Sequence, residues 1–195
     1  MSVVDKEKWE LKYRDKPQLL EYREASGVVQ RYGCRGQGER ALDLACGTGR
    51  HSLYLASEGF EVDAIDIASA AMEVLMVDAL RQGVAERISP IEADLDAYKF
   101  ENGSYDLIVM SNYLDRTLLE RTKDALKRGG IYIVETYMQD DENEKRDSKS
   151  SNLLQPGELK EIFAQGYKVL HYDEYDNEAH EIYRMRKQVI VAERL

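Results

Sequence analysis

The sequence predicts an α/β fold, with an open and largely parallel sheet covered by helices on both faces. Segments that read as strands alternate with segments of helical period along most of the chain, which is typical of a parallel sheet. In addition, a glycine-containing turn joins the first predicted strand to a helix that begins immediately afterwards. The length of 195 residues, with 43% hydrophobic and 33% charged residues, fits a single globular domain.

The individual elements are identified by their periodicity and by the residues that end them. The predicted strands are residues 41–45, 60–66, 87–92, 105–110, 131–137, 168–172 and 188–193. The predicted helices are residues 5–32, interrupted at Pro17, and residues 49–57, 68–82, 114–127 and 157–164. Gly59 and the pair Gly129 and Gly130 are expected to end the helices that precede them. The last two strands, separated by a polar stretch, predict a hairpin.

The chain shows no internal repeat and no clear linker, so residues 1–195 are predicted to form one domain. Residues 31–40 are rich in glycine and polar residues and read as a loop. Residues 138–152 are charged, with serines near the end, and predict a flexible loop on the ligand side of the sheet. We hypothesise that this loop closes over bound substrate as a lid. The alternative is an ordinary surface loop.

The composition favours a cytoplasmic protein. The two cysteines, Cys34 and Cys46, form neither a disulfide framework nor a metal-binding cluster, which fits a reducing compartment. No apolar run approaches the roughly 20 residues of a transmembrane helix. The first residues carry charges where a signal peptide has its apolar region. The formal net charge of -10 does not attract DNA, RNA or an anionic membrane.

The most informative segment runs from Ala41 to Asp66. Its strand enters a turn containing Gly47 and Gly49, and glycines let the turn be tight and let a ligand approach the backbone closely. Asp66 ends the next predicted strand, where a carboxylate accepts hydrogen bonds from both hydroxyls of a ribose. This order of elements predicts a nucleoside-binding site. The alternative is a tight turn followed by a solvated aspartate.

Motifs along the chain narrow the choice among nucleoside-containing ligands. The run from Asp43 to Arg50, Asp-Leu-Ala-Cys-Gly-Thr-Gly-Arg, resembles the first motif of the class I S-adenosylmethionine-dependent methyltransferases. Asp66, the segment Ala93-Asp94-Leu95, the strand at residues 105–110 and the turn at residues 126–131 are similar to later motifs of that family, in the same order. The resemblance covers nearly the whole chain. It implies a Rossmann-like, seven-stranded sheet that is mostly parallel, with an antiparallel C-terminal strand.

A narrower resemblance is carried by three short segments. Residues 50–56, the pair Lys12-Tyr13 and residues 156–159 are similar to the tellurite-resistance, TehB-like subgroup of small-molecule methyltransferases. The sequence departs from the family pattern at Ala45, where the first glycine of the turn motif stands. A methyl group is expected to be tolerated at that position.

The resemblance implies S-adenosylmethionine as the cofactor and S-adenosylhomocysteine as the product. The turn would face the aminocarboxylate end, Asp66 the ribose, Asp94 the adenine edge, and the residues after the fourth strand the sulfonium. The N-terminal segment, residues 1–32, would cover this site; the alternative is a surface helix. The implied cofactor-binding residues are Tyr13, Arg14, Asp43, Ala45, Gly47, Gly49, Asp66, Ile67, Asp94, Leu95, Ser111 and Asn112.

The methyl acceptor is expected to bind after the fourth strand, at residues 111–116, which lack the Asn-Pro-Pro-aromatic motif of many DNA and glutamine methyltransferases. Tyr113 would pack against the acceptor and Arg116 would bind an acceptor anion, unless Arg116 pairs with Asp115 or Glu120. His180 lies where the TehB-like subgroup carries a pocket histidine; the alternative is an ordinary loop histidine. The sulfonium methyl is already activated, so a dedicated base is optional and no metal is expected.

The leading hypothesis is an enzyme that methylates a small molecule such as a chalcogen oxyanion, a thiol or a carboxylate. It would work as a monomer or a homodimer, without DNA or membrane. Methylation of RNA or protein is the second hypothesis, and the acidic composition argues against RNA. A cofactor-binding regulatory or partner protein without catalysis is the third hypothesis, and an NAD-dependent reductase is the fourth.

Overall fold

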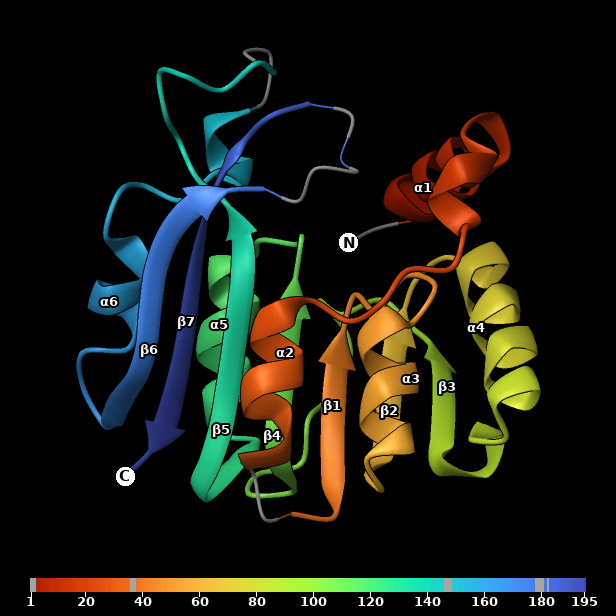
Figure 1. Cartoon of the computed structure of the whole chain (residues 1–195), viewed down its shortest axis with the longest axis horizontal. Coiled ribbons are helices and arrows are strands. Elements are labelled where there is room, and N and C mark those ends of the chain that lie inside the picture. The colour runs from red at the N-terminus through yellow and green to blue at the C-terminus, as the bar shows by residue number, and fades with distance from the viewer. Residues whose placement is uncertain (1–2, 36–37, 146–148, 178–180, 182) are drawn as a thin grey trace.

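The chain forms one seven-stranded sheet in the strand order β3-β2-β1-β4-β5-β7-β6 (Figure 1). This computed structural model describes residues 3–35, 38–145, 149–177, 181 and 183–195. Strands β3, β2, β1, β4 and β5 pair in parallel, and β7 pairs antiparallel with both β5 and β6. The predicted fold class is therefore confirmed, including the antiparallel C-terminal strand and the late hairpin.

The boundaries of most elements lie close to those expected. The strands are β1 (Arg40–Leu44), β2 (Glu61–Asp66), β3 (Ile88–Glu92), β4 (Tyr105–Ser111), β5 (Leu126–Tyr137), β6 (Tyr167–Asp176) and β7 (Arg186–Arg194). The α-helices are α1 (Val3–Asp15), α2 (Gly27–Tyr32), α3 (Arg50–Ser57), α4 (Ser69–Gln82), α5 (Arg116–Lys123) and α6 (Glu158–Ile162). Short 3-10 helices are η1 (Pro17–Leu20), η2 (Gly33–Arg35), η3 (Ala85–Arg87) and η4 (Ser150–Asn152).

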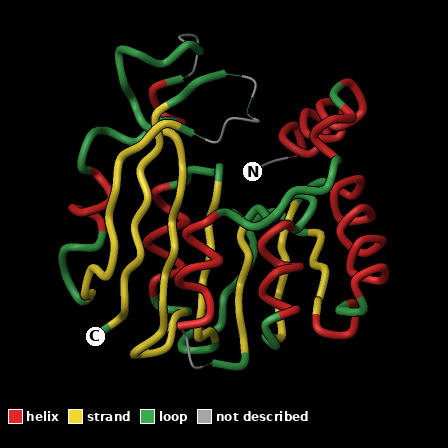
Figure 2. The backbone as a smooth tube through the Cα atoms, in the orientation of Figure 1, coloured by secondary structure: helices red, strands yellow, loops and turns green. Residues whose placement is uncertain are grey.

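Two apolar cores lie on opposite faces of the sheet because side chains alternate along each strand. Helices α2, α3 and α4 pack on one face, which we call the α3 face, with Leu55 and Leu75 at its centre. Helices α5 and α6 pack on the other face, where the rings of Phe163 and Tyr132 make a T-shaped contact. Figure 2 shows the same layers, with loops gathered at both ends of the strands. The sheet is thus buried on both sides, as a parallel sheet requires.

The boundary between α5 and β5 differs from the prediction. The helix expected to run to residue 127 ends at Lys123, and β5 begins at Leu126, before the two glycines that were expected to stop the helix. Leu126 pairs with Tyr105, and the register then shifts so that Leu107 pairs with Ile131. The glycines therefore lie inside a strand irregularity, with Gly129 at a φ of 75°. Pairing with β4 overrides the local helical pattern.

The strand order reverses direction around β1, whose neighbours are β2 on one side and β4 on the other. In open α/β sheets ligands bind beyond the carboxyl ends of the strands at such a switch point. Helix α1 lies beyond this edge, above α4 (Figure 1). Among the described helices, none has the length and apolar composition that crossing a membrane requires.

Candidate functional site

The turn after β1 is built around Gly47 and Gly49. Gly47 has a φ of 56°, and Gly49 has a φ of 74° and precedes the first residue of α3 in a left-handed conformation. A Cβ atom on Gly49 would lie 2.2 Å from Cδ1 of Leu75, which is fully buried in α4. Gly49 is therefore required both by its backbone conformation and by the close approach of α4 to the turn.

Two residues other than glycine also adopt the left-handed conformation at this edge, and both belong to the predicted site. Ala45, after β1, and Asn112, after β4, each have a φ of 54°. Asparagine visits this region more readily than most residues, whereas alanine does so at a cost of about 1–2 kcal/mol. The family pattern has glycine where this chain has Ala45, because glycine adopts a positive φ without this cost. Backbone strain of this kind is found most often at functional sites.

Asp66 ends β2 beside the glycine turn. Its carboxylate is 8% exposed, and its oxygens accept hydrogen bonds from the backbone N–H of Gly47 (2.8 Å) and of Ala68 (2.9 Å). Burial raises the pKa of Asp66 above its ordinary value, partly offset by these two hydrogen bonds. The alternative of a solvated aspartate is therefore wrong for this carboxylate. The arrangement fixes the carboxylate in place and leaves acceptor positions free for further donors.

Asp43 lies beneath the turn rather than at its surface. The carboxylate is 1% exposed, and Oδ2 accepts hydrogen bonds from the hydroxyl (2.6 Å) and the backbone N–H (3.0 Å) of Ser52 in α3. Burial raises the pKa of Asp43 to about 7, although the Ser52 donors and the charge of Arg50 act in the opposite direction. Asp43 thus ties α3 to β1 and holds the turn from behind.

Helix α1 packs against the turn, the start of α4 and the end of β3. Tyr13 is 8% exposed, and its hydroxyl lies 3.2 Å from the position that a Cβ on Gly47 would occupy. Glu10 accepts a hydrogen bond from the backbone N–H of Ser69 (2.6 Å), and Lys6 forms an ion pair with Glu92 of β3. Burial raises the pKa of Tyr13, as do the nearby Asp66 and Cys46.

The other residues implied by the resemblance lie along the same edge. Arg14 points to solvent, with 76% of its side chain exposed near Asp15. Ile67 and Leu95 are buried, at 5% and 0% exposure. Asp94 follows β3 and accepts a hydrogen bond from the backbone N–H of Asp96 (2.9 Å). Ser111 ends β4 next to Glu135 of β5.

Arg116 has partners other than those considered from the sequence. Its guanidinium binds both carboxylate oxygens of Glu158 and the carbonyl oxygens of Ser151 (2.9 Å) and Leu153 (3.0 Å). Asp115 instead caps α5 by accepting a hydrogen bond from Leu118 N–H, and Glu120 pairs with Lys123. Arg116 therefore clamps the segment before α6. His180 lies outside the described residues, and Tyr113 is half-buried.

The clamp leads to a prediction for Arg116→Lys. A lysine cannot reproduce the two-pronged contact with Glu158 and both carbonyl contacts, so the free energy of unfolding should fall by about 1–2 kcal/mol. Urea denaturation measures this. The control is Arg81→Lys, which should change little because the Arg81 side chain is 75% exposed where it pairs with Asp78. Unchanged stability would show that Arg116 does not hold this segment.

A buried polar cluster lies on the α3 face beyond the turn. We call it the β4–β5 polar cluster, and it consists of Arg50, Ser111, Glu135 and Tyr175. Glu135 is 3% exposed and accepts hydrogen bonds from the hydroxyls of Ser111 (3.3 Å) and Tyr175. The guanidinium of Arg50 approaches the Glu135 carboxylate to 3.9 Å. The cluster joins α3 to strands β4, β5 and β6.

A second buried charged side chain lies beyond Glu135, further along the same strands. Lys187 of β7 is fully buried and donates a hydrogen bond to Glu181 (2.6 Å), which also accepts one from Tyr137. Burial would raise the pKa of Glu181, but Lys187 and Tyr137 lower it overall. His51 has a buried Nε2 without a partner among the described residues, and burial, with Arg50 and Lys187, lowers its pKa.

The sequence analysis did not single out Glu135 or Lys187. The signal for Glu135 was one acid within the apolar strand Ile131-Tyr-Ile-Val-Glu-Thr-Tyr137. A buried charge is expensive without compensation, so an acid on the core face of a strand marks a position with a specific partner. The partner Tyr175 comes from β6, which no sequence pattern brings next to Glu135.

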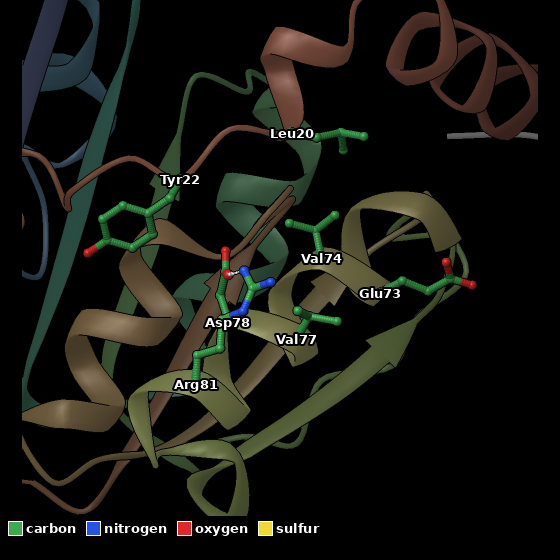
Figure 3. A pocket seen from close by; sticks show the side chains of 7 residues that line it. All are labelled: Leu20, Tyr22, Glu73, Val74, Val77, Asp78 and Arg81. Carbon is green, nitrogen blue, oxygen red and sulfur yellow. Dashed lines mark hydrogen bonds and ion pairs between the residues drawn. The ribbon is translucent and has the colours of Figure 1, made fainter.

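A separate hollow of about 410 Å³ lies on the outer surface between α4 and the segment after η1 (Figure 3). None of the residues implied for the cofactor lines it. Its lining residues are Leu20, Tyr22, Glu73, Val74, Val77, Asp78 and Arg81. Within the described ranges, no group of three or more histidine, cysteine, aspartate or glutamate side chains could hold a metal ion.

Comparison with known proteins finds a family model that matches the part of the chain containing the turn. Residues 41–130 match the model of a methyltransferase domain. The sarcosine/dimethylglycine N-methyltransferase of Aphanothece halophytica is 30% identical over 110 residues, which are 53% of this chain and 40% of that protein. The chain spans less than half the length of the curated relatives that it matches.

Solved structures share the fold. TehB from Haemophilus influenzae has a TM-score of 0.76 and 23% identity, covering 88% of this chain and 63% of that one. The geranyl diphosphate C-methyltransferase from Streptomyces coelicolor A3(2), solved with Mg²⁺, geranyl diphosphate and S-adenosyl-L-homocysteine, has a TM-score of 0.63 and 14% identity. That similarity covers 81% of this chain and 71% of the other. At these identities the structures establish a common fold.

Proposed function

We propose that this chain, which belongs to the class I S-adenosylmethionine-dependent methyltransferases, transfers the methyl group of that cofactor to a small molecule. S-adenosylmethionine is the cofactor of the family, and S-adenosylhomocysteine would be the product. The relative that acts on sarcosine and dimethylglycine supports a small acceptor. We also propose which residues of this chain bind the cofactor and that the acceptor is small.

The observation that carries the proposal is the placement of Asp66. Its carboxylate is held beside the turn by the backbone of Gly47 and Ala68, at the edge where β1 marks the switch point. A carboxylate fixed by backbone donors needs no rearrangement to accept the two hydroxyl hydrogens of a ribose. On this basis the adenosine would lie over β2 and β3, with Asp66 at the ribose and Asp94 at the adenine edge.

The methionine end of the cofactor would lie over the turn and the end of β4. The backbone from Ala45 to Gly49 would face the aminocarboxylate, and Ser111 and Asn112 would lie beside the sulfonium. Tyr13 would cover the cofactor from α1. The residues of the chain then align the acceptor with the methyl–sulfur bond and exclude water, which is the main requirement for transfer of an already activated methyl group.

Calorimetric titration of S-adenosylhomocysteine tests the proposal. We expect the wild-type protein to bind this ligand and Asp66→Ala to bind it more weakly by about 1–3 kcal/mol, because hydrogen bonds to the ribose are lost. Asp78→Ala removes a carboxylate of α4 that pairs with the exposed Arg81 and is not among the residues implied for the cofactor, so this variant is the control and should bind normally. Absence of binding by the wild type, or equal binding by Asp66→Ala, would contradict the proposal.

A further inference from the structure

The β4–β5 polar cluster lies on the side of the site where the reacting end of the cofactor would be. Under the proposed function, Asp66 and Asp94 place the adenosine over β2 and β3, so the sulfonium lies towards β4. Leu44, Met110 and Val134 form one row across β1, β4 and β5. Ser111 and Glu135 form the next row towards the carboxyl edge. Glu135 is thus one strand beyond the position beside the sulfonium.

The charge of Glu135 is compensated less closely than that of the neighbouring Glu181. Glu181 has the Lys187 ammonium at 2.6 Å, whereas the cation described beside Glu135 is Arg50, at 3.9 Å. The hydrogen bonds to Glu135 come from the neutral hydroxyls of Ser111 and Tyr175. A carboxylate that is 3% exposed and held mainly by neutral donors favours a cationic ligand, because such a ligand offsets the cost of burying the charge.

We propose that Glu135 binds the methyl acceptor, that the acceptor carries an amine, and that the Glu135 carboxylate receives the proton released on methylation. This inference rests on the proposed methyltransferase function. The two hydroxyls hold the carboxylate in one orientation, on the side of β4 away from the adenosine. The acceptor would therefore enter between the cofactor and β6, over the face formed by β5 and β7.

The transfer step balances with the groups present. An acceptor that binds as an ammonium ion first loses one proton to solvent. The resulting neutral amine donates an N–H hydrogen bond to Glu135, which directs the nitrogen lone pair towards the sulfonium methyl. The nitrogen–carbon bond forms as the sulfur–carbon bond breaks, and the electron pair of the broken bond stays on sulfur as a neutral thioether. The methylated nitrogen then carries an extra proton, which passes to the Glu135 carboxylate. The positive charge that forms on the nitrogen therefore develops beside the negative carboxylate and is neutralised by the proton transfer.

Sinefungin tests this inference without knowledge of the acceptor. This analogue of S-adenosylmethionine carries an ammonium group in place of the sulfonium methyl, so its nitrogen occupies the position where methyl transfer occurs. Calorimetry would compare sinefungin with S-adenosylhomocysteine, which is neutral at the sulfur. We expect the wild type to prefer sinefungin by about tenfold, and Glu135→Gln to lose that preference while binding S-adenosylhomocysteine within about twofold of the wild type.

Two variants complete the test. Glu120→Gln, at an exposed pair on α5, is the control and should keep the preference for sinefungin. Glu135→Asp withdraws the carboxylate by one methylene and should reduce the preference, which provides a readout if Glu135→Gln does not fold. If Glu135→Gln binds both ligands more weakly to the same extent, or if the wild type does not prefer sinefungin, this inference is overturned and the proposed function is unaffected. Absence of S-adenosylhomocysteine binding by the wild type would instead contradict the proposed function.

Discussion

Gly49→Ala is expected to lower the free energy of unfolding by about 2–5 kcal/mol. A side chain at a φ of 74° costs about 1–2 kcal/mol, and overpacking of a close-packed core costs a further 1–3 kcal/mol. The overpacking arises because the new methyl group would lie 2.2 Å from Cδ1 of Leu75, which is completely buried and cannot retreat into solvent. Urea denaturation with a constant m-value measures the change.

Gly83→Ala is a closely matched control for this prediction. Gly83 follows α4 with a φ of 72°, and nothing lies within 4 Å of the position that its Cβ would take. This variant therefore carries the backbone strain without the collision, and we expect a loss of only about 1–2 kcal/mol. The difference between the two variants isolates the contact between the turn and α4. Equal losses would show that Leu75 and its surroundings yield without cost.

The difference in the free energy of unfolding between Asp43→Asn and the wild type is expected to change by about 4 kcal/mol between pH 4 and pH 7. The pKa of Asp43 is raised from 3.8 to about 7 in the folded protein because the carboxylate is buried. Between these values the folded state binds more protons than the unfolded state, so the wild-type stability falls as the pH rises, by about 1.4 kcal/mol per unit. The asparagine variant has no group to titrate at this position.

The free energy of unfolding of Asp43→Asn, relative to the wild type, should therefore increase as the pH rises through this window. The amide oxygen still accepts the hydrogen bonds from Ser52, so the fold is retained. Asp106→Asn is a control of opposite sign. Burial alone would raise the pKa of Asp106, but Lys127 and the backbone N–H groups of Arg40 and Glu39 together lower it, so this carboxylate stabilises the fold at higher pH. If the difference in the free energy of unfolding between Asp43→Asn and the wild type does not vary with pH, the prediction for Asp43 is contradicted.

The sequence was sufficient for the sheet because each strand–helix unit carries its own local signals. The turn at Gly47 and Gly49 and the acid Asp66 could be identified since strand, glycine and terminal acid follow one another closely along the chain. The end of α5 could not be predicted, because Ala125 and Leu126 continue the helical apolar spacing and only pairing with β4 makes Leu126 part of a strand. Local patterns do not contain that pairing.

The acceptor side was less predictable because its contacts join segments distant in sequence. The sequence predicts that Arg116 binds an acceptor anion or pairs with Asp115 or Glu120, but the clamp with Glu158 depends on how α6 returns to the sheet. Likewise, Tyr175 of β6 can be identified as a partner of Glu135 only from the folded sheet, in which β7 lies between β5 and β6. In both cases the side chain could be recognised as charged, while its partner is set by topology.

The docking of α1 has a consequence for the rate of cofactor exchange. Its contacts reach the turn through Tyr13, α4 through Glu10 and β3 through Lys6, which are the elements that would surround the adenosine. A cofactor that binds beneath Tyr13 can enter or leave only while α1 is undocked, so both rates scale with the population of the undocked state. Under the proposed function, α1 would therefore set an upper limit on turnover through product release.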